Sequence, residues 1–130
     1  MVWTDWTLDR TLVLFTSAAY LLVAVQVTMS HYRQNFHQKI MLAPVISAPL
    51  YFVVGIALVL LNRSWLFTLF HICMWLGVLS GLYGFYLHVK GVGKRVGDYA
   101  PRNFLIGPPV VMPLLYTAIG LLGLIAIYGR

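Results

Sequence analysis

Acidic residues are almost absent from this sequence. It contains three of them, Asp5, Asp9 and Asp98, against nine lysines and arginines, and none lies within the long apolar segments. Hydrolytic sites built on paired carboxylates, and proton-coupled transport through a carboxylate inside the membrane, both need acids that are missing here. The sequence also has no H-E-x-x-H motif, no phosphate-binding P-loop and no Ser-His-Asp arrangement. These absences predict that the chain is not an enzyme on its own.

Cysteine is nearly absent as well. The single cysteine, Cys73, lies inside an apolar segment. One cysteine excludes an intrachain disulfide and a thiolate metal cluster, and it gives no indication of the redox compartment.

Charged residues of any kind are scarce, at 9% of the chain against about 25% in a soluble domain. Hydrophobic residues make up 61%, and the mean hydropathy is +0.85. Because a helix needs about 20 apolar residues to cross a bilayer, four spans fill nearly the whole chain. We therefore predict an all-α integral membrane protein with one domain over residues 1–130. The predicted antiparallel spans are about residues 11–30, 40–61, 64–90 and 108–128.

The first ten residues carry Asp5 and Asp9 and not the basic region of a cleaved signal peptide, so we predict that the first span is retained. Trp3 and Trp6 are expected at the level of the lipid headgroups. Thr7 or Asp9 is expected to cap the first helix.

Positive charge is concentrated in two of the connections. The first and third connections hold six of the nine basic residues, namely Arg33, Lys39, Lys90, Lys94, Arg95 and Arg102. The positive-inside rule then predicts that these connections are cytoplasmic and that both termini lie outside a bacterial inner membrane. A basic surface for nucleic acid is not predicted, because these charges sit in short connections between spans. The glycines and Pro101 of residues 91–107 predict that this stretch is not helical.

The second half of the sequence partly repeats the first. APVISAPL at residues 43–50 matches GPPVVMPL at 107–114, and His31 and His88 end the first and third predicted spans. Two such hairpins with an even number of spans are expected to be related by a pseudo-two-fold axis along the membrane normal. Pro49 is expected to kink its helix or to leave a backbone carbonyl free.

The third span carries a stripe of glycines that ends in a histidine. Gly77, Gly81, Gly84 and His88 follow the i, i+4, i+7, i+11 spacing of one helix face. Small residues let a helix or a flat cofactor approach the backbone closely. We therefore predict that His31 and His88 are the iron ligands of a b-type haem. The alternative is that both are interfacial histidines and that the glycines serve only helix packing. The haem propionates would meet the basic residues of the same rim, Arg33, Lys39, Lys90 and Lys94.

His71 lies deeper in the same span, on a different face from the glycines. An ionisable residue inside the membrane is a functional candidate, and we predict contact with a quinone, a pigment or a partner subunit. The alternative is a neutral histidine that binds a backbone carbonyl. His37, in the basic first connection, is expected to be solvated or to face the lipid headgroups.

Three functions follow from these features. The first is a small membrane subunit of an electron-transfer complex, acting as an anchor with or without a haem between His31 and His88. The second is a cofactor-free structural or assembly subunit, and the third is a small homo-oligomeric transporter, which the missing intramembrane charges disfavour. The expected partners are other membrane subunits and lipid. The general layout resembles that of four-helix membrane cytochrome anchors, although no motif assigns the chain to a named family.

Overall fold

The computed structural model describes all 130 residues and contains helices and no strands. The long helices are α1 (Leu8–Arg33), α2 (Leu42–Leu61), α3 (Ser64–Val96) and α4 (Val111–Tyr128). Two short 3₁₀ helices, η1 (Lys39–Met41) and η2 (Pro101–Leu105), lie in the connections. All four long helices are long and apolar enough to cross a membrane, which confirms the predicted all-helical class and the number of apolar spans.

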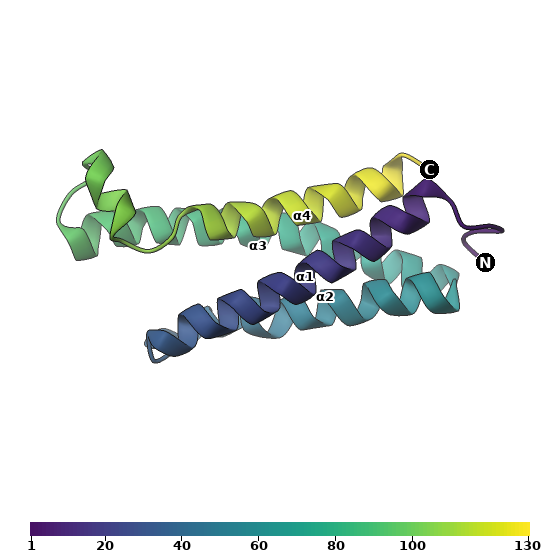
Figure 1. Ribbon diagram of the computed structural model, residues 1–130, viewed down its shortest axis with the longest axis horizontal. Coiled ribbons are helices and arrows are strands. Elements are labelled where there is room, and N and C mark those ends of the chain that lie inside the picture. The colour runs from purple at the N-terminus through teal and green to yellow at the C-terminus, as the bar shows by residue number, and fades with distance from the viewer.

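The helices form two pairs, α1 with α2 and α3 with α4. The start of α1 lies beside the end of α2, where Arg10 donates to the Val59 carbonyl. The end of α1 lies beside the start of α2, where His31 contacts the Met41 carbonyl. The two pairs meet at the end that carries both termini and diverge towards the opposite end (Figure 1). The wedge between the diverging pairs is the feature that positions the candidate site.

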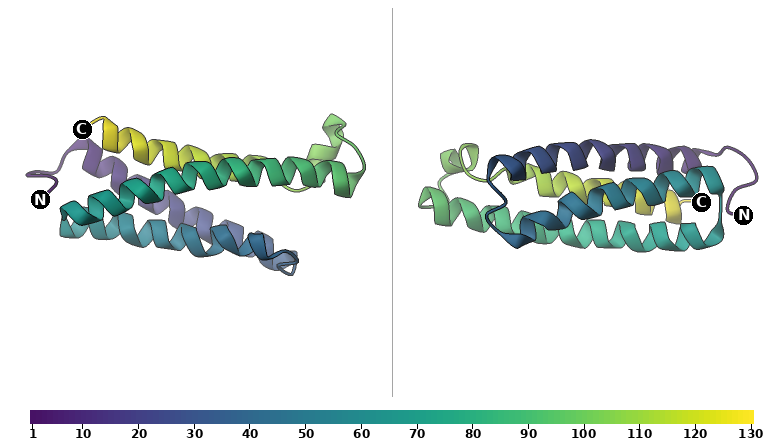
Figure 2. Two further views of the ribbon diagram at one scale, coloured as in Figure 1. Left: turned by 180° about the vertical axis from the view of Figure 1, so that it is seen from behind. Right: turned by 90° about the horizontal axis from the view of Figure 1, so that it is seen from below.

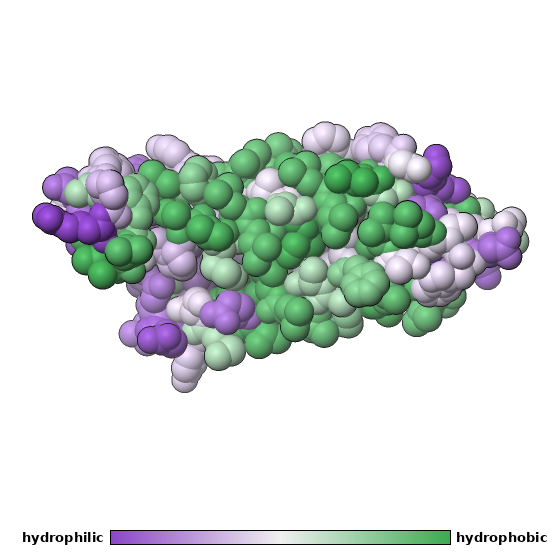
Figure 3. Space-filling model, turned by 45° about the horizontal axis from the view of Figure 1, so that its top comes forward, coloured by the Kyte–Doolittle hydropathy of each residue, from purple (hydrophilic) through white to green (hydrophobic).

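The outside of this bundle is apolar. A band of hydrophobic side chains covers the middle of the molecule, and hydrophilic residues gather towards the two ends (Figure 3). Large apolar side chains such as Phe15, Leu22 and Leu60 are 64%, 72% and 71% exposed. An apolar surface of this extent suits lipid or another protein and not water.

Helix α3 runs six residues past its predicted end, and the prediction that residues 91–96 are not helical is wrong (Figure 2). Glycine in a helix costs about 1 kcal/mol relative to alanine. Here the missing side chains let Pro108 pack on Gly91 and Tyr99 pack on Gly93, while Val92 between them is fully buried. The helix ends at Gly97, whose φ of 110° is open to glycine and strained for other residues.

The positions of the prolines relative to the helix starts do not follow the predicted repeat between the two halves of the sequence. Pro44 is the third residue of α2, and Pro113 is the third residue of α4, whereas Pro108 precedes α4 altogether. The structure therefore does not place Pro44 and Pro108 at matching positions. Pro49 lies inside α2, which continues through it.

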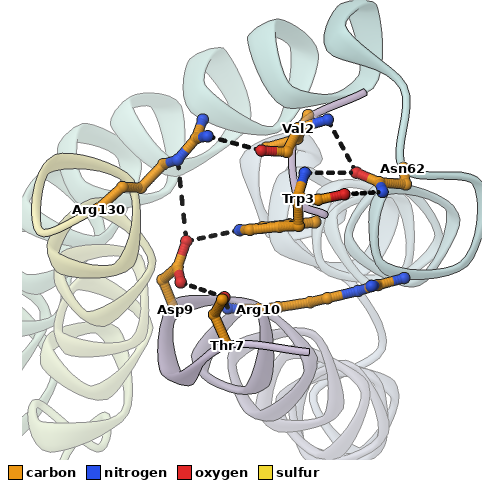
Figure 4. Close-up of polar contacts among 7 residues, drawn as sticks. All are labelled: Val2, Trp3, Thr7, Asp9, Arg10, Asn62 and Arg130. Carbon is orange, nitrogen blue, oxygen red and sulfur yellow. Dashed lines mark hydrogen bonds and ion pairs between the residues drawn. The ribbon is translucent and has the colours of Figure 1, made fainter. Parts of the chain in front are cut away.

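Asn62 holds the N-terminal segment against the end of the bundle (Figure 4). Its side-chain oxygen accepts from the amides of Val2 and Trp3, each at 2.9 Å, and its amide nitrogen donates to the Trp3 carbonyl at 2.7 Å. The Trp3 indole donates to Asp9 at 2.5 Å and is only 5% exposed. Trp3 is therefore packed within the chain, while its place at the level of the lipid headgroups stays a prediction. Thr7 caps α1 by accepting from the Arg10 amide, as predicted.

We expect Asn62→Gly to release this segment without disturbing the turn. Asn62 has a φ of 55°, which glycine adopts freely, so the substitution removes only the side-chain hydrogen bonds. Hydrogen exchange at the Val2 and Trp3 amides should become about tenfold faster. Asn35→Gly is the matched control, because Asn35 has a similar φ of 58° and lies in the α1–α2 connection. Unchanged exchange in Asn62→Gly would contradict the role of Asn62.

Candidate functional site

A cavity of about 390 Å³ occupies the wedge between the two helix pairs. All four long helices line it, at the end of the bundle that carries the α1–α2 and α3–α4 connections. Both histidines of the predicted pair, His31 and His88, are among the lining residues. The structure therefore brings together, at one cavity, two residues that are far apart in the sequence.

His31 lies at the end of α1 and is 8% exposed. Its Nδ1 atom is 2.7 Å from the Met41 carbonyl oxygen. A carbonyl only accepts, so Nδ1 carries the hydrogen of the neutral ring, and Nε2 is left with a lone pair. Nε2 of His31 makes no hydrogen bond within the chain.

His88 repeats this arrangement on α3. Its Nδ1 atom is 2.7 Å from the Pro109 carbonyl oxygen, and its Nε2 also makes no hydrogen bond within the chain. Pro109 precedes α4, which starts at Val111, so its carbonyl takes no part in the hydrogen bonds of that helix and can accept from His88. Histidines that bind metals usually have the other ring nitrogen held by a carbonyl or a carboxylate, as both are here.

The glycine stripe is divided between the cavity and the protein interior. Gly81 and Gly84 line the cavity, whereas Gly77 does not. A side chain at Gly77 would meet the ring of Tyr51 at 3.5 Å, and one at Gly81 would meet the Pro113 carbonyl at 2.7 Å. The glycines were predicted to leave room for a helix or a cofactor. Much of that room is filled by α4 and by tyrosines of the core.

Basic residues form the outer rim of the cavity. Lys90, Lys94 and Arg95 line it, while Arg33 and Lys39 do not. Arg95 also donates to the Nε2 atom of His37, which is exposed as predicted and belongs to the α1–α2 connection. This contact joins the two helix pairs across the rim.

Hydroxyl groups that were not predicted from the sequence line the inner part of the cavity. Ser47 on α2 and Tyr116 on α4 share a hydrogen bond and both line the cavity. The Tyr20 hydroxyl donates to the Tyr116 carbonyl at 3.1 Å, and the rings of Tyr20 and Tyr51 are 5.1 Å apart, edge to face. The signal was present in the sequence, because all three tyrosines lie near the middle of a span, whereas tyrosine usually lies at membrane interfaces.

We expect Ser47→Ala and Tyr116→Phe each to lower the free energy of unfolding by about 1 kcal/mol, the usual contribution of one hydrogen bond. Because both remove the same bond between α2 and α4, the double variant should lose much less than the sum of the two. Denaturation in detergent measures all three values. Tyr83→Phe is the control, since Tyr83 lines the cavity without a hydrogen bond in the chain. Fully additive losses would show that the two hydroxyls do not interact.

His71 does not line the cavity. Its Nε2 atom is 2.7 Å from the hydroxyl of Tyr128, at the end of α4, and 3.2 Å from the indole nitrogen of Trp75. The alternative of a bond to a backbone carbonyl is not what the structure has, because both partners are side chains. His71 and the cavity are thus separate candidate sites.

No three histidine, cysteine or acidic side chains lie close enough together to hold a metal ion. The chemistry available at the cavity is therefore that of two imidazoles with free Nε2 atoms, a basic rim and a hydroxyl-lined inner end. Comparisons of the chain with protein-family models, curated proteins and solved structures found no match.

Proposed function

We propose that the chain is a small membrane subunit of an electron-transfer complex and that it holds a b-type haem between His31 and His88. One observation carries this proposal. Two imidazoles line the same cavity, and each has its Nδ1 atom fixed by a backbone carbonyl at 2.7 Å and its Nε2 atom free. Such a carbonyl fixes the tautomer and raises the basicity of the other ring nitrogen.

The cavity volume and the lining residues support this cofactor. The cavity volume of about 390 Å³ is within the range of ligand sites, which is about 300–1,000 Å³. His31 and His88 would bind the haem iron, and Lys90, Lys94 and Arg95 would bind the propionates through charge-assisted hydrogen bonds. When bound, the haem supplies one-electron transfer. The protein's own part is to fix two imidazoles and to surround them with apolar helices.

We propose that the four helices cross a bacterial inner membrane as antiparallel spans. The connections at the cavity end hold most of the basic residues, which supports a cytoplasmic position for this end and an external position for both termini. The matching contacts of His31 and His88 with carbonyls near the starts of α2 and α4 support two related hairpins.

A cofactor-free assembly subunit is the second candidate. The observation that favours it is the exposed apolar surface on all four helices, which suits contact with other membrane subunits. The same surface also suits an anchor that holds a haem, so the two candidates differ only in the cofactor. A homo-oligomeric transporter is less favoured, since no acidic side chain lines the cavity.

Purification of the tagged full chain from its native membrane in mild detergent tests the proposal. We expect the chain to elute with redox-active partner subunits and with a haem absorption band that changes on reduction with dithionite. If the chain elutes with partner subunits but without haem, it is the cofactor-free assembly subunit. If the chain elutes with neither partner subunits nor haem, both candidate functions are excluded.

A further inference from the structure

Three polar aromatic side chains meet on an outer face of the α3–α4 pair, away from the cavity. His71 and Trp75 are one turn apart on α3, and Tyr128 is the last residue of α4. The His71 and Tyr128 rings are edge to face with centroids 5.1 Å apart. Trp75 and Tyr128 are 45% and 64% exposed, so the group is open to its surroundings.

One hydrogen-bonding position in this group has no partner. The Nε2 atom of His71 is 2.7 Å from the Tyr128 hydroxyl, and the Trp75 indole lies 3.2 Å from Nε2 and 3.4 Å from that hydroxyl. Whichever ring nitrogen carries the hydrogen, these contacts engage Nε2 alone. The Nδ1 atom of His71 makes no hydrogen bond within the chain. In a membrane, an unpaired polar group costs several kcal/mol, which favours an occupant that completes the bond.

The surroundings restrict that occupant to a neutral, lipid-soluble molecule. The exposed side chains next to the group along α3 and α4 are uncharged, namely Thr68 and the apolar Ile72, Leu76, Leu121 and Ile125. Arg130, two residues after Tyr128, lies over the Phe67 ring and is already engaged by Asp9 at 3.8 Å and by the Val2 carbonyl at 2.7 Å. An anionic headgroup would therefore find Arg130 already engaged. The side open to lipid would accept a long apolar tail.

We propose that His71, Trp75 and Tyr128 form a binding site for the head of a membrane quinone. A quinone has a flat neutral ring, a lipid-soluble tail and carbonyl oxygens that accept a hydrogen bond from Nδ1–H. The hydroxyl of the corresponding quinol donates to Nδ1 when the hydrogen is on Nε2. Trp75 and Tyr128 hold the imidazole in place and offer their rings to the flat head. The site is independent of the haem proposed between His31 and His88.

Infrared spectroscopy of the full chain in lipid nanodiscs tests this site without any haem. The probe is a short-chain benzoquinone with a ¹³C label at one carbonyl, titrated against protein-free nanodiscs as the reference. We expect saturable binding and a downshifted carbonyl band. His71→Phe should abolish the shift and weaken binding about tenfold, the effect of one lost hydrogen bond. His71→Gln should keep part of the shift, because the amide can still donate.

His37→Phe is the matched control, because His37 is exposed in the α1–α2 connection and contacts none of the three residues. Its binding and band position should equal those of the unmodified chain. The proposal would be overturned if the quinone partitioned equally into nanodiscs with and without the protein. It would also be overturned if the carbonyl band of the quinone were shifted equally in His71→Phe and in the unmodified chain. If His71→Phe loses partner subunits while quinone binding persists, the group is a protein contact instead. The haem proposal stands or falls separately, since none of these readouts uses haem.

Discussion

His31→Ala and His88→Ala are each expected to lower haem affinity by more than about a hundredfold, because each removes one of the two proposed axial ligands. Loss of an outer-shell partner of a metal ligand already costs about ten- to a hundredfold. Neither substitution should unfold the chain, since each removes one hydrogen bond, from Nδ1 to a backbone carbonyl, which contributes about 1 kcal/mol. Titration of the purified variants with haemin, followed in the visible spectrum, measures the loss.

Two controls make this result specific. His71→Ala removes a histidine that does not line the cavity and should leave haem affinity unchanged. Addition of free imidazole should partly restore the spectrum of His88→Ala, whose side chain is more exposed than that of His31. Equal haem affinity in the unmodified chain and in both alanine variants would contradict ligation by His31 and His88.

Gly81→Ala is expected to destabilise the fold by about 3 kcal/mol, the upper end of the usual cost of overpacking. The added methyl group would lie 2.7 Å from the Pro113 carbonyl oxygen and 2.8 Å from the Thr117 amide nitrogen. These are backbone atoms of α4, so they can move away only if the two helices separate. Thermal unfolding in detergent, monitored by circular dichroism, measures the effect.

Gly84→Ala is the matched control on the same helix face. Its methyl group would meet only the Pro113 side chain, at 3.3 and 3.7 Å, and the expected loss of stability is below about 1 kcal/mol. If Gly81→Ala is as stable as Gly84→Ala, the close packing of α3 on α4 is wrong. Because Gly81 packs against α4 of the same chain, a substitution there changes the stability of the fold. Any loss of association with a partner subunit would be a consequence of that change.

The sequence predicts the number and the position of the helices because hydropathy alone determines them. Charged residues are confined to the ends of the helices and to the connections, so the spans are apparent without any knowledge of packing. The end of α3 was predicted wrongly for a physical reason. Gly91 and Gly93 are weak helix formers by themselves, and only the contacts of Pro108 and Tyr99 favour the helix there.

The candidate site was only partly predictable. His31 and His88 are conspicuous in the sequence, because each ends an apolar span, and the structure places both at one cavity. The hydroxyls of Ser47 and Tyr116 meet across 69 residues of sequence, and no local pattern indicates that α2 and α4 bring them together. The carbonyl that holds His88 was equally hidden, since it depends on how the segment before α4 folds back on α3.

The most direct test of the central proposal is electron paramagnetic resonance of the purified full chain after titration with one equivalent of haemin in lipid nanodiscs. Ligation by His31 and His88 predicts a low-spin ferric signal typical of two imidazole ligands, saturating at one haem per chain. The same signal should be absent from His31→Ala and His88→Ala. A high-spin signal, or haem that distributes into protein-free nanodiscs to the same extent, would contradict it.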